Sequence, residues 1–296
     1  MIKLGFIGFG EAAFNISKGL KAEGLEGIMA YDKFWNVEPQ SDLISKRAQD
    51  AGVEIMPSLQ GLVENSDFIL SAVSANMAVF LAQAAKPFLQ PNQVYVDLNA
   101  TSPMTKEEVD AIVSPAALFV DCAVMGPVPT YKHKVPVSVS GSGARVFSEA
   151  MAPYGMNITF MDAPAGSASA SKMFRSIFMK GFVVLILEML VAAHEYKVED
   201  DVLLSVKETL TSGPLLDVIN GLVGRGVIHS ERREHEMDEV IATLDAIGVD
   251  AIMSKASKSK LNWCTKFGLK EYFKGVPPQD FHEIFSALDK INKKEA

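Results

Sequence analysis

The positions of hydrophobic residues divide the chain into two parts with different periodicity. Up to residue 162, short apolar and β-branched runs alternate with amphipathic stretches, which is typical of strands alternating with helices. Such alternation produces a mostly parallel sheet with helices on both faces. We therefore expect a doubly wound α/β domain over residues 1–162. The predicted strands are residues 3–8, 27–32, 53–57, 67–73, 94–98, 117–121, 135–141 and 157–161.

Residues 163–296 carry a helical pattern almost throughout, which predicts a second, all-helical domain. Its first helix is expected from about 166 to 197. The apolar stretch at 173–193 is about as long as a membrane span, but it contains Arg175, Lys180 and Glu188. We therefore predict a helix buried within the protein and no insertion into a membrane.

Composition and charge exclude several classes of function. The chain of 296 residues is 48% hydrophobic, has a formal net charge of −8 and contains no block of Lys and Arg. A nucleic-acid partner is not expected, because binding one requires a basic face that replaces phosphate counterions. Cys122 and Cys264 are far apart and have no second pair, which predicts neither a disulfide framework nor a zinc site. A reducing, cytoplasmic location fits this cysteine usage best.

A glycine-rich turn follows the first predicted strand. Gly8, Gly10 and Ala13 form the pattern G-x-G-x-x-A. Gly8 permits a tight turn, Gly10 lets the backbone approach a pyrophosphate, and small Ala13 lets the helix pack closely on the strand. Glycine turns also join strands to helices for steric reasons alone. The amides that would face the phosphate belong to the turn and the first helical residues, Phe9, Glu11 and Ala12.

Asp32 ends the second predicted strand and supports a dinucleotide site. It follows Gly10 at close to the roughly 20 residues that separate this motif from the acid on the cofactor ribose. A carboxylate there binds the ribose hydroxyls and repels a 2′-phosphate, so NAD is favoured over NADP. Lys33 leaves room for NADP, and a solvated acid in a turn is the alternative interpretation of Asp32.

Polar side chains also follow the next strands along the chain. Ser74 and Asn76 come after the strand at 67–73, and Asn99 comes after the strand at 94–98. At the carboxyl edge of a parallel sheet they can form neutral hydrogen bonds with a nicotinamide or its ribose. Loop residues of this kind also cap helices, and that interpretation stays open for Ser74 and Asn76.

Four stretches together resemble the β-hydroxyacid dehydrogenase family, whose members include 3-hydroxyisobutyrate and 6-phosphogluconate dehydrogenases. They are GFIGFGEAA at 5–13, DLNATSP at 97–103, DCAVMGP at 121–127 and AGSASASKMFRSIFMKGF at 165–182. The helical remainder resembles the variant C-terminal domain of one branch of that family.

The resemblance implies an NAD(P)-binding Rossmann domain and a helical substrate and dimerisation domain. It implies hydride transfer between the nicotinamide and a small hydroxy acid or related polar alcohol. It also assigns the role of general acid or base to Lys172, at the start of the long helix. A lysine partly removed from water in a cleft can be tuned to move the hydroxyl proton.

Two positions depart from the pattern of that family. Ser176 stands where the usual members have an asparagine one turn after the lysine, and Met125 replaces the first serine of their Ser-Gly-Gly substrate loop. We expect Met125, Gly126 and Ser176 to contact the substrate, but in a way that differs from the best-known members.

Arg232 and Arg233 offer a replacement anchor, because a guanidinium suits a carboxylate or phosphate. Ion pairing of Arg232 with Glu236, four residues later on a helix, is the competing interpretation. His229 and His235 are six residues apart and so do not share a helical face, which argues against a metal site.

Two alternative functions stay open. An imine reductase would share the fold and cofactor, although the lysine at 172 counts against it because an acid or tyrosine is usual there. A nucleotide-binding sensor without turnover would also fit the departures at Met125 and Ser176. A homodimer is expected with any of these functions, because a helix that is apolar on nearly all sides needs cover from a second copy.

Overall fold

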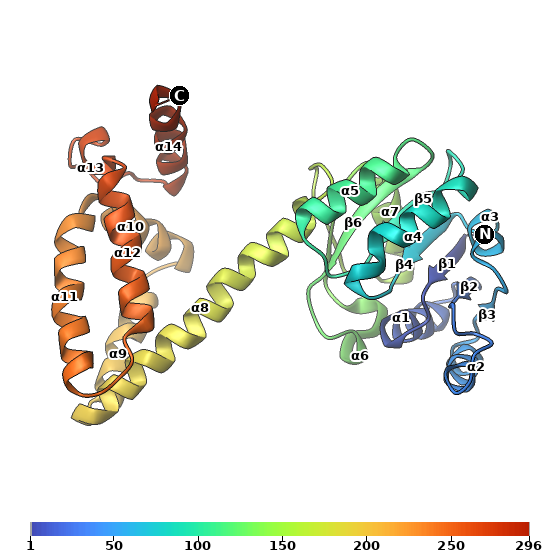
Figure 1. Cartoon of the computed structure of the whole chain (residues 1–296), viewed down its shortest axis with the longest axis horizontal. Helices are drawn as coiled ribbons and strands as arrows, with labels where there is room; N and C mark the ends of the chain where they lie inside the picture. Colours follow the sequence, from blue (N-terminus) through green and yellow to red (C-terminus); the bar gives the residue numbers. More distant parts are fainter. Residues whose placement is uncertain (1, 296) are drawn as a thin grey trace. The chain divides into compact units, whose positions relative to one another are not determined.

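The computed structural model describes residues 2–295, and within them eight strands form one sheet (Figure 1). The strand order is β3-β2-β1-β4-β5-β6-β7-β8, and the β6–β7 pair is antiparallel whereas the other pairs are parallel. Each predicted strand region overlaps one strand, so the predicted Rossmann-type sheet is confirmed. The strands are β1 (Lys3–Ile7), β2 (Gly27–Tyr31), β3 (Glu54–Ile55), β4 (Phe68–Ser71), β5 (Val94–Asp97), β6 (Leu118–Val124), β7 (Val137–Ser140) and β8 (Ile158–Phe160).

Helices cover both faces of the sheet because alternate strand residues point in opposite directions. Phe6 and Leu70 belong to the core that includes Ile16 of α1, whereas Ile7 and Ile69 belong to the core on the other face. The α-helices are α1 (Glu11–Ala22), α2 (Gln40–Ala51), α3 (Leu59–Glu64), α4 (Ala78–Ala85), α5 (Pro103–Val113), α6 (Val128–Tyr131) and α7 (Ala144–Met151). Short 3₁₀ helices are η1 (Ala75–Met77), η2 (Lys86–Phe88), η3 (Lys132–Lys134) and η4 (Ala152–Tyr154).

The direction of strand order changes between β1 and β4. From β1 the chain proceeds outward to β2 and β3, then returns to place β4 on the other side of β1. The loops that follow β1 and β4 therefore diverge to opposite faces and leave a crevice at the carboxyl ends of these strands. This is the edge at which the sequence predicts the cofactor.

The remainder of the chain is helical, as predicted. By residue contacts the chain divides into compact units Met1–Ile177 and Phe178–Ala296. The predicted boundary between 162 and 163 precedes α8, whereas this division falls within α8. The helices are α8 (Ser167–Tyr196), α9 (Glu199–Leu210), α10 (Leu215–Ile228), α11 (Ser230–Ala246), α12 (Ile252–Lys266), α13 (Leu269–Tyr272) and α14 (Phe281–Glu295).

Helix α8 is long and apolar enough, by length and composition, to cross a membrane. The prediction that it is buried inside the chain is wrong. Ala168 and Ala193, near its two ends, are buried, but Ile177 is 72% exposed and Val183 is 61% exposed. Only 6% of the most apolar 18-residue window of α8 is buried within residues 2–295.

Candidate functional site

The turn between β1 and α1 combines one tightly packed glycine with one open glycine. Gly8 has a φ of +86°, and a Cβ there would lie 2.6 Å from Val73 Cγ1 and 2.7 Å from the carbonyl oxygen of Ala72. Both the backbone conformation and the closeness of the loop after β4 therefore require glycine. A Cβ at Gly10 would meet no heavy atom of the described residues within 4 Å. Gly10 thus leaves the amino end of α1 open to a ligand.

The first turn of α1 carries backbone N–H groups that have no partner inside the helix. Glu11 and Ala12 are exposed in this turn, so their amides can face a phosphate. Phe9 differs, because its side chain is fully buried and its amide donates to Asp32 Oδ2 at 2.9 Å. Phe9 therefore stabilises the turn, and its amide is already engaged.

Asp32 joins the ends of the first two strands. Besides the bond from Phe9, its Oδ1 accepts a hydrogen bond from the amide of Phe34 at 3.0 Å. The carboxylate therefore stabilises the turn. A carboxylate offers about four lone-pair sites, so two backbone bonds leave acceptor capacity for a ligand. Asp32 is partly exposed and lines a cavity, where that capacity is accessible.

This cavity, of about 560 Å³, lies at the carboxyl ends of β1, β2 and β4. It brings together four of the predicted cofactor residues, Gly8, Gly10, Asp32 and Ser74. An apolar cleft with a few polar groups, at the point where strand order reverses, is typical of a dinucleotide site. Most of its remaining wall is apolar: Ile7, Tyr31, Phe34, Leu59, Ala72, Val73, Met77, Phe80, Leu81 and Ala84.

The polar residues after β4 and β5 have different environments. Ser74 is exposed, precedes η1 without a capping hydrogen bond from its side chain, and lines the cavity. Asn76 is exposed within η1 and lies outside the cavity lining. Asn99 is buried, accepts a hydrogen bond from the Val73 amide at 2.7 Å and donates to Ser71 Oγ at 3.0 Å. Asn99 therefore holds the loops after β4 and β5 together.

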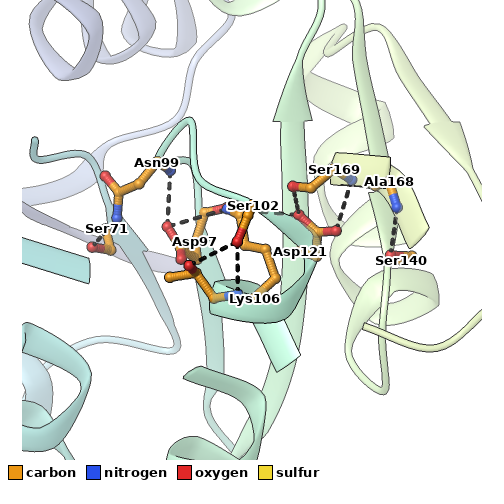
Figure 2. Close-up of polar contacts among 10 residues, drawn as sticks. Ser71, Asp97, Asn99, Ser102, Lys106, Asp121, Ser140, Ala168 and Ser169 are labelled. Carbon is orange, nitrogen blue, oxygen red and sulfur yellow. Dashed lines mark hydrogen bonds and ion pairs between the residues drawn. The ribbon is translucent and has the colours of Figure 1, made fainter. Parts of the chain in front are cut away.

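A buried ion cluster lies beside these strands (Figure 2). Lys106 on α5 is fully buried, and its Nζ donates to the carbonyl oxygen of Asp97 at 2.7 Å. The same ammonium lies 3.4 Å from Asp97 Oδ1 and 3.6 Å from Asp121 Oδ1. Asp97 and Asp121 are paired residues of neighbouring β5 and β6, so the two carboxylates face one cation. Burial raises the pKa of Asp97, and the Lys106 charge opposes that rise.

The sequence prediction did not include this cluster, although the residue pattern of α5 carries a signal for it. Lys106, Val109 and Val113 are all buried residues of α5, with the spacing of one helical face. A lysine on the apolar face of a helix is unusual unless an anion faces it. Aspartates within two neighbouring strand patterns supply the anions, but their register with α5 is apparent only in the folded chain.

Lys172 lies in the second turn of α8 and is half-buried. Burial lowers the pKa of its ammonium, and the charge of Lys106 lowers it further. Cys122 of β6 acts in the opposite direction, but burial raises the pKa of its thiol to about 12, so the thiol is uncharged near neutral pH. A lysine with a lowered pKa is suited to exchanging a proton with a substrate.

The predicted substrate residues occupy the end of β6 and the next turn of α8. Met125 and Gly126 are partly exposed, and the Met125 amide donates to the Pro136 carbonyl at 2.8 Å, which fixes this loop against the chain entering β7. Ser176 Oγ donates to the Lys172 carbonyl at 3.3 Å. Its hydroxyl keeps acceptor capacity for a substrate or water.

Arg232 and Arg233 lie on α11 in the second unit. Arg232 forms an ion pair with Glu236, the competing interaction that the sequence suggests. Arg233 forms no ion pair among the described residues. Within residues 2–295 there is no group of three or more His, Cys, Asp or Glu side chains that could hold a metal ion.

Two family models match separate parts of the chain. Residues 3–101 match the family described as NADP oxidoreductase coenzyme F420-dependent. Residues 193–264 match a domain of unknown function, DUF1932. The first match covers the glycine turn and Asp32, and the second covers most of the helical unit.

Solved structures resemble nearly the whole chain. A conserved hypothetical protein from Sinorhizobium meliloti 1021 is 31% identical, with 98% of this chain and 97% of that chain covered and a TM-score of 0.67. The conserved protein MTH1747, described as structurally similar to 3-hydroxyacid dehydrogenases, is 29% identical, with coverage of 93% and 100% and a TM-score of 0.63.

More distant structures share the fold. An imine reductase from Aspergillus terreus is 15% identical over 91% of this chain and 95% of its own, with a TM-score of 0.72. A 3-hydroxyisobutyrate dehydrogenase from Mycobacterium tuberculosis is 17% identical over 91% and 94%, with a TM-score of 0.62. The fold is therefore that of NAD(P)-dependent oxidoreductases with a helical second domain.

Proposed function

We propose that this chain is a dehydrogenase acting on a CH–OH group. The premise is that the chain belongs to the β-hydroxyacid dehydrogenase family, in the branch with a variant helical C-terminal domain. Its substrate is a small hydroxy acid or related polar alcohol. The observation that supports this proposal most strongly is the half-buried Lys172, whose pKa is lowered, on the helix that begins against β6 and β7.

The cavity after β1, β2 and β4 would hold the cofactor. The amides of Glu11 and Ala12 would bind the pyrophosphate, which Gly10 leaves room to approach. Asp32 would accept hydrogen bonds from the adenosine ribose, and its negative charge favours NAD over NADP. Ser74 lines the same cavity and would bind toward the nicotinamide half. When bound, the nicotinamide supplies or accepts the hydride.

Lys172 would move the hydroxyl proton. In the direction of oxidation the neutral amine accepts the proton as the carbinol carbon loses its hydride, and in reduction the ammonium returns it. A lowered pKa makes the neutral amine accessible at a lower pH than for an exposed lysine. The rate of oxidation should therefore rise with pH through the pKa of Lys172, below the ordinary value of 10.5.

Met125, Gly126 and Ser176 would form the substrate wall. The apolar Met125 side chain cannot bind a carboxylate, so a charged substrate needs a different anchor.

Reduction of an imine is the second candidate, because an imine reductase shares this fold. The two reactions are separated by incubating the protein with NAD, NADP and their reduced forms against hydroxy acids, sugar acids, alcohols and cyclic imines. Turnover of a hydroxy compound supports the proposal. Turnover of imines alone would assign the chain to the second candidate. Tight cofactor binding without turnover across the panel would favour a nucleotide sensor.

The exposed apolar middle of α8 would be covered by a second copy of the chain. A homodimer removes side chains such as Phe174, Ile177 and Phe178 from water without a membrane. Because a homodimer would cover α8 without a membrane, we propose that the protein is cytoplasmic. In the cytoplasm the thiols of Cys122 and Cys264 stay reduced.

A further inference from the structure

Lys106 is fully buried, and its ammonium lies close to a carboxylate on each of two neighbouring strands. Its Nζ lies 3.4 Å from Asp97 Oδ1 and 3.6 Å from Asp121 Oδ1 (Figure 2). Burying one ammonium and two carboxylates is costly, and apolar residues of similar volume would fill the same space without that cost. Such a cluster is a poor source of stability, which points to a second role for it.

Asp121 connects this cluster to the first turn of α8. Its Oδ2 accepts a hydrogen bond from the Ser169 amide at 2.9 Å, and its Oδ1 accepts one from Ser169 Oγ at 2.6 Å. The neighbouring Ala168 amide donates to Ser140 Oγ of β7 at 3.1 Å. These bonds fix the first turn of α8 against β6 and β7. Ser169 and Lys172 are three residues apart on that helix, so they lie one above the other.

Asp97 connects the same cluster to the loop expected to bind the nicotinamide. Its Oδ1 accepts a hydrogen bond from the Asn99 amide at 2.8 Å, and the Asn99 side chain holds the Val73 amide and Ser71. Lys106 thus stands between the loops after β4 and β5 and the start of α8.

We propose that Lys106 and Asp121 are positioning residues for Lys172: together they hold the first turn of α8 in place and set the charge that Lys172 experiences. The inference rests on the proposed function, in which Lys172 exchanges the substrate proton. Neither Lys106 nor Asp121 is a catalytic residue, because both are sealed from solvent.

Lys106 and Cys122 have opposing effects on the pKa of Lys172, and Asp121 and Asp97 act on it through their pairing with Lys106. Lys106, on α5, disfavours a second ammonium nearby, in the same direction as burial. Asp121 on β6 and Asp97 on β5 carry the charge that compensates Lys106, and Cys122 is uncharged near neutral pH. Removing the cation and removing an anion should therefore change the Lys172 pKa in opposite directions.

The test measures the charge state of Lys172 without a substrate or cofactor. The protein is reductively methylated with formaldehyde and a borane reductant over a range of pH, and mass spectrometry gives the pH of half-maximal labelling at Lys172. The variants are Lys106→Met and Asp121→Asn. Lys86→Met is the matched control, because Lys86 is exposed in η2. This helix precedes β5 and so lies toward the amino ends of the strands, away from the ends that carry the cluster.

We expect Lys106→Met to raise the labelling midpoint of Lys172 by about one pH unit and Asp121→Asn to lower it. Lys86→Met should leave it unchanged. Midpoints that move in the same direction, or not at all, in the two cluster variants would overturn the inference, since a purely structural role predicts no dependence on the sign of the removed charge.

Asp121→Asn retains an oxygen acceptor for Ser169. If Lys106→Met does not fold, the test rests on whether Asp121→Asn lowers the labelling midpoint of Lys172. Ser169→Ala keeps all the charges and the backbone bond from Ser169 to Asp121, so it should leave the midpoint unchanged. A shift as large as that of the charge variants would overturn the electrostatic part of the inference. Opposite shifts combined with wild-type turnover in Lys172→Ala would support the placement of Lys172 while refuting the proposed function.

Discussion

The Phe9 amide donates a hydrogen bond to Asp32 Oδ2 at 2.9 Å, which joins the glycine-rich turn after β1 to the end of the second strand. The carboxylate thus has two roles: it orients the backbone of the turn, and its charge faces the cavity in which a cofactor ribose would lie. Replacement of Asp32 should therefore affect both stability and cofactor choice.

Asp32→Ala should lower the free energy of unfolding by about 1–3 kcal/mol, because the Phe9 amide loses its acceptor. It should also reduce the preference for NADH over NADPH. Asp32→Asn is the matched variant, since it removes the charge but keeps an acceptor. Urea denaturation and fluorescence titration with both cofactors provide the measurements. An unchanged cofactor preference in both variants would mean that Asp32 does not select NAD.

Gly8 and Gly10 should respond differently to the same substitution. Gly8→Ala places a Cβ 2.6 Å from Val73 Cγ1 at a φ of +86°, so we expect a loss of about 3 kcal/mol in the free energy of unfolding. Gly10→Ala has room within the chain and an ordinary φ of −74°, so its stability should change by less than about 0.5 kcal/mol. Its cofactor affinity should nevertheless fall at least about tenfold, because the Cβ occupies the path of the pyrophosphate. If Gly10→Ala binds the cofactor with wild-type affinity, the pyrophosphate does not bind at this turn.

The sequence was sufficient for the sheet because each strand has its own local signal. Alternation of short β-branched runs with amphipathic segments located all the strands, and the glycine turn with Asp32 located the crevice that the cavity occupies. These features depend on residues close together in the chain, or on a rule of strand order that applies to parallel sheets in general.

Features that depend on long-range register were not accessible in the same way. The buried contact of Lys106 with Asp121 requires the pairing of β5 with β6, and the engagement of Phe9 by Asp32 requires the pairing of β1 with β2. The exposure of α8 was also missed, because a nearly uniform apolar pattern predicts burial without saying which molecule supplies the cover.

Glu188 on α8 should make stability depend on acidic pH. Its carboxylate accepts hydrogen bonds from the amides of Met253 and Ser254, at 2.6 and 2.8 Å, and from Ser254 Oγ at 2.7 Å. Burial raises its pKa, but these bonds from Ser254 and Met253 outweigh burial, and the net pKa lies below the ordinary value of 4.5. The stabilisation is therefore present above pH 4.5 and lost as the pH falls through the lower folded-state pKa.

Glu188→Gln should accordingly cost about 1–2 kcal/mol in free energy of unfolding near pH 7, and progressively less at acidic pH. Urea denaturation from pH 7 to pH 3 measures this difference. Glu195→Gln, an exposed position on the same helix, serves as control. A difference between wild type and Glu188→Gln that stays constant across this range would contradict the assigned role of the carboxylate.

Phe178→Asp should disrupt the proposed homodimer, because Phe178 is an exposed apolar residue in the middle of α8. Light scattering after gel filtration in detergent-free buffer should give a dimer for wild type and a monomer for the variant. Lys180→Glu is the control, since it changes charge on the same turn without altering the apolar surface. A monomeric wild type, or a wild type that requires detergent, would refute a second copy as the cover of α8.

The most direct test of a dehydrogenase that uses Lys172 is the rate of hydride transfer in Lys172→Ala. With the best substrate of the panel, we expect the turnover rate to fall by about 10²–10⁴-fold while the dissociation constant of the cofactor stays unchanged. Lys180→Ala, exposed on the same helix, should keep the wild-type rate. Full turnover by Lys172→Ala would contradict the assignment of Lys172 as the group that moves the proton.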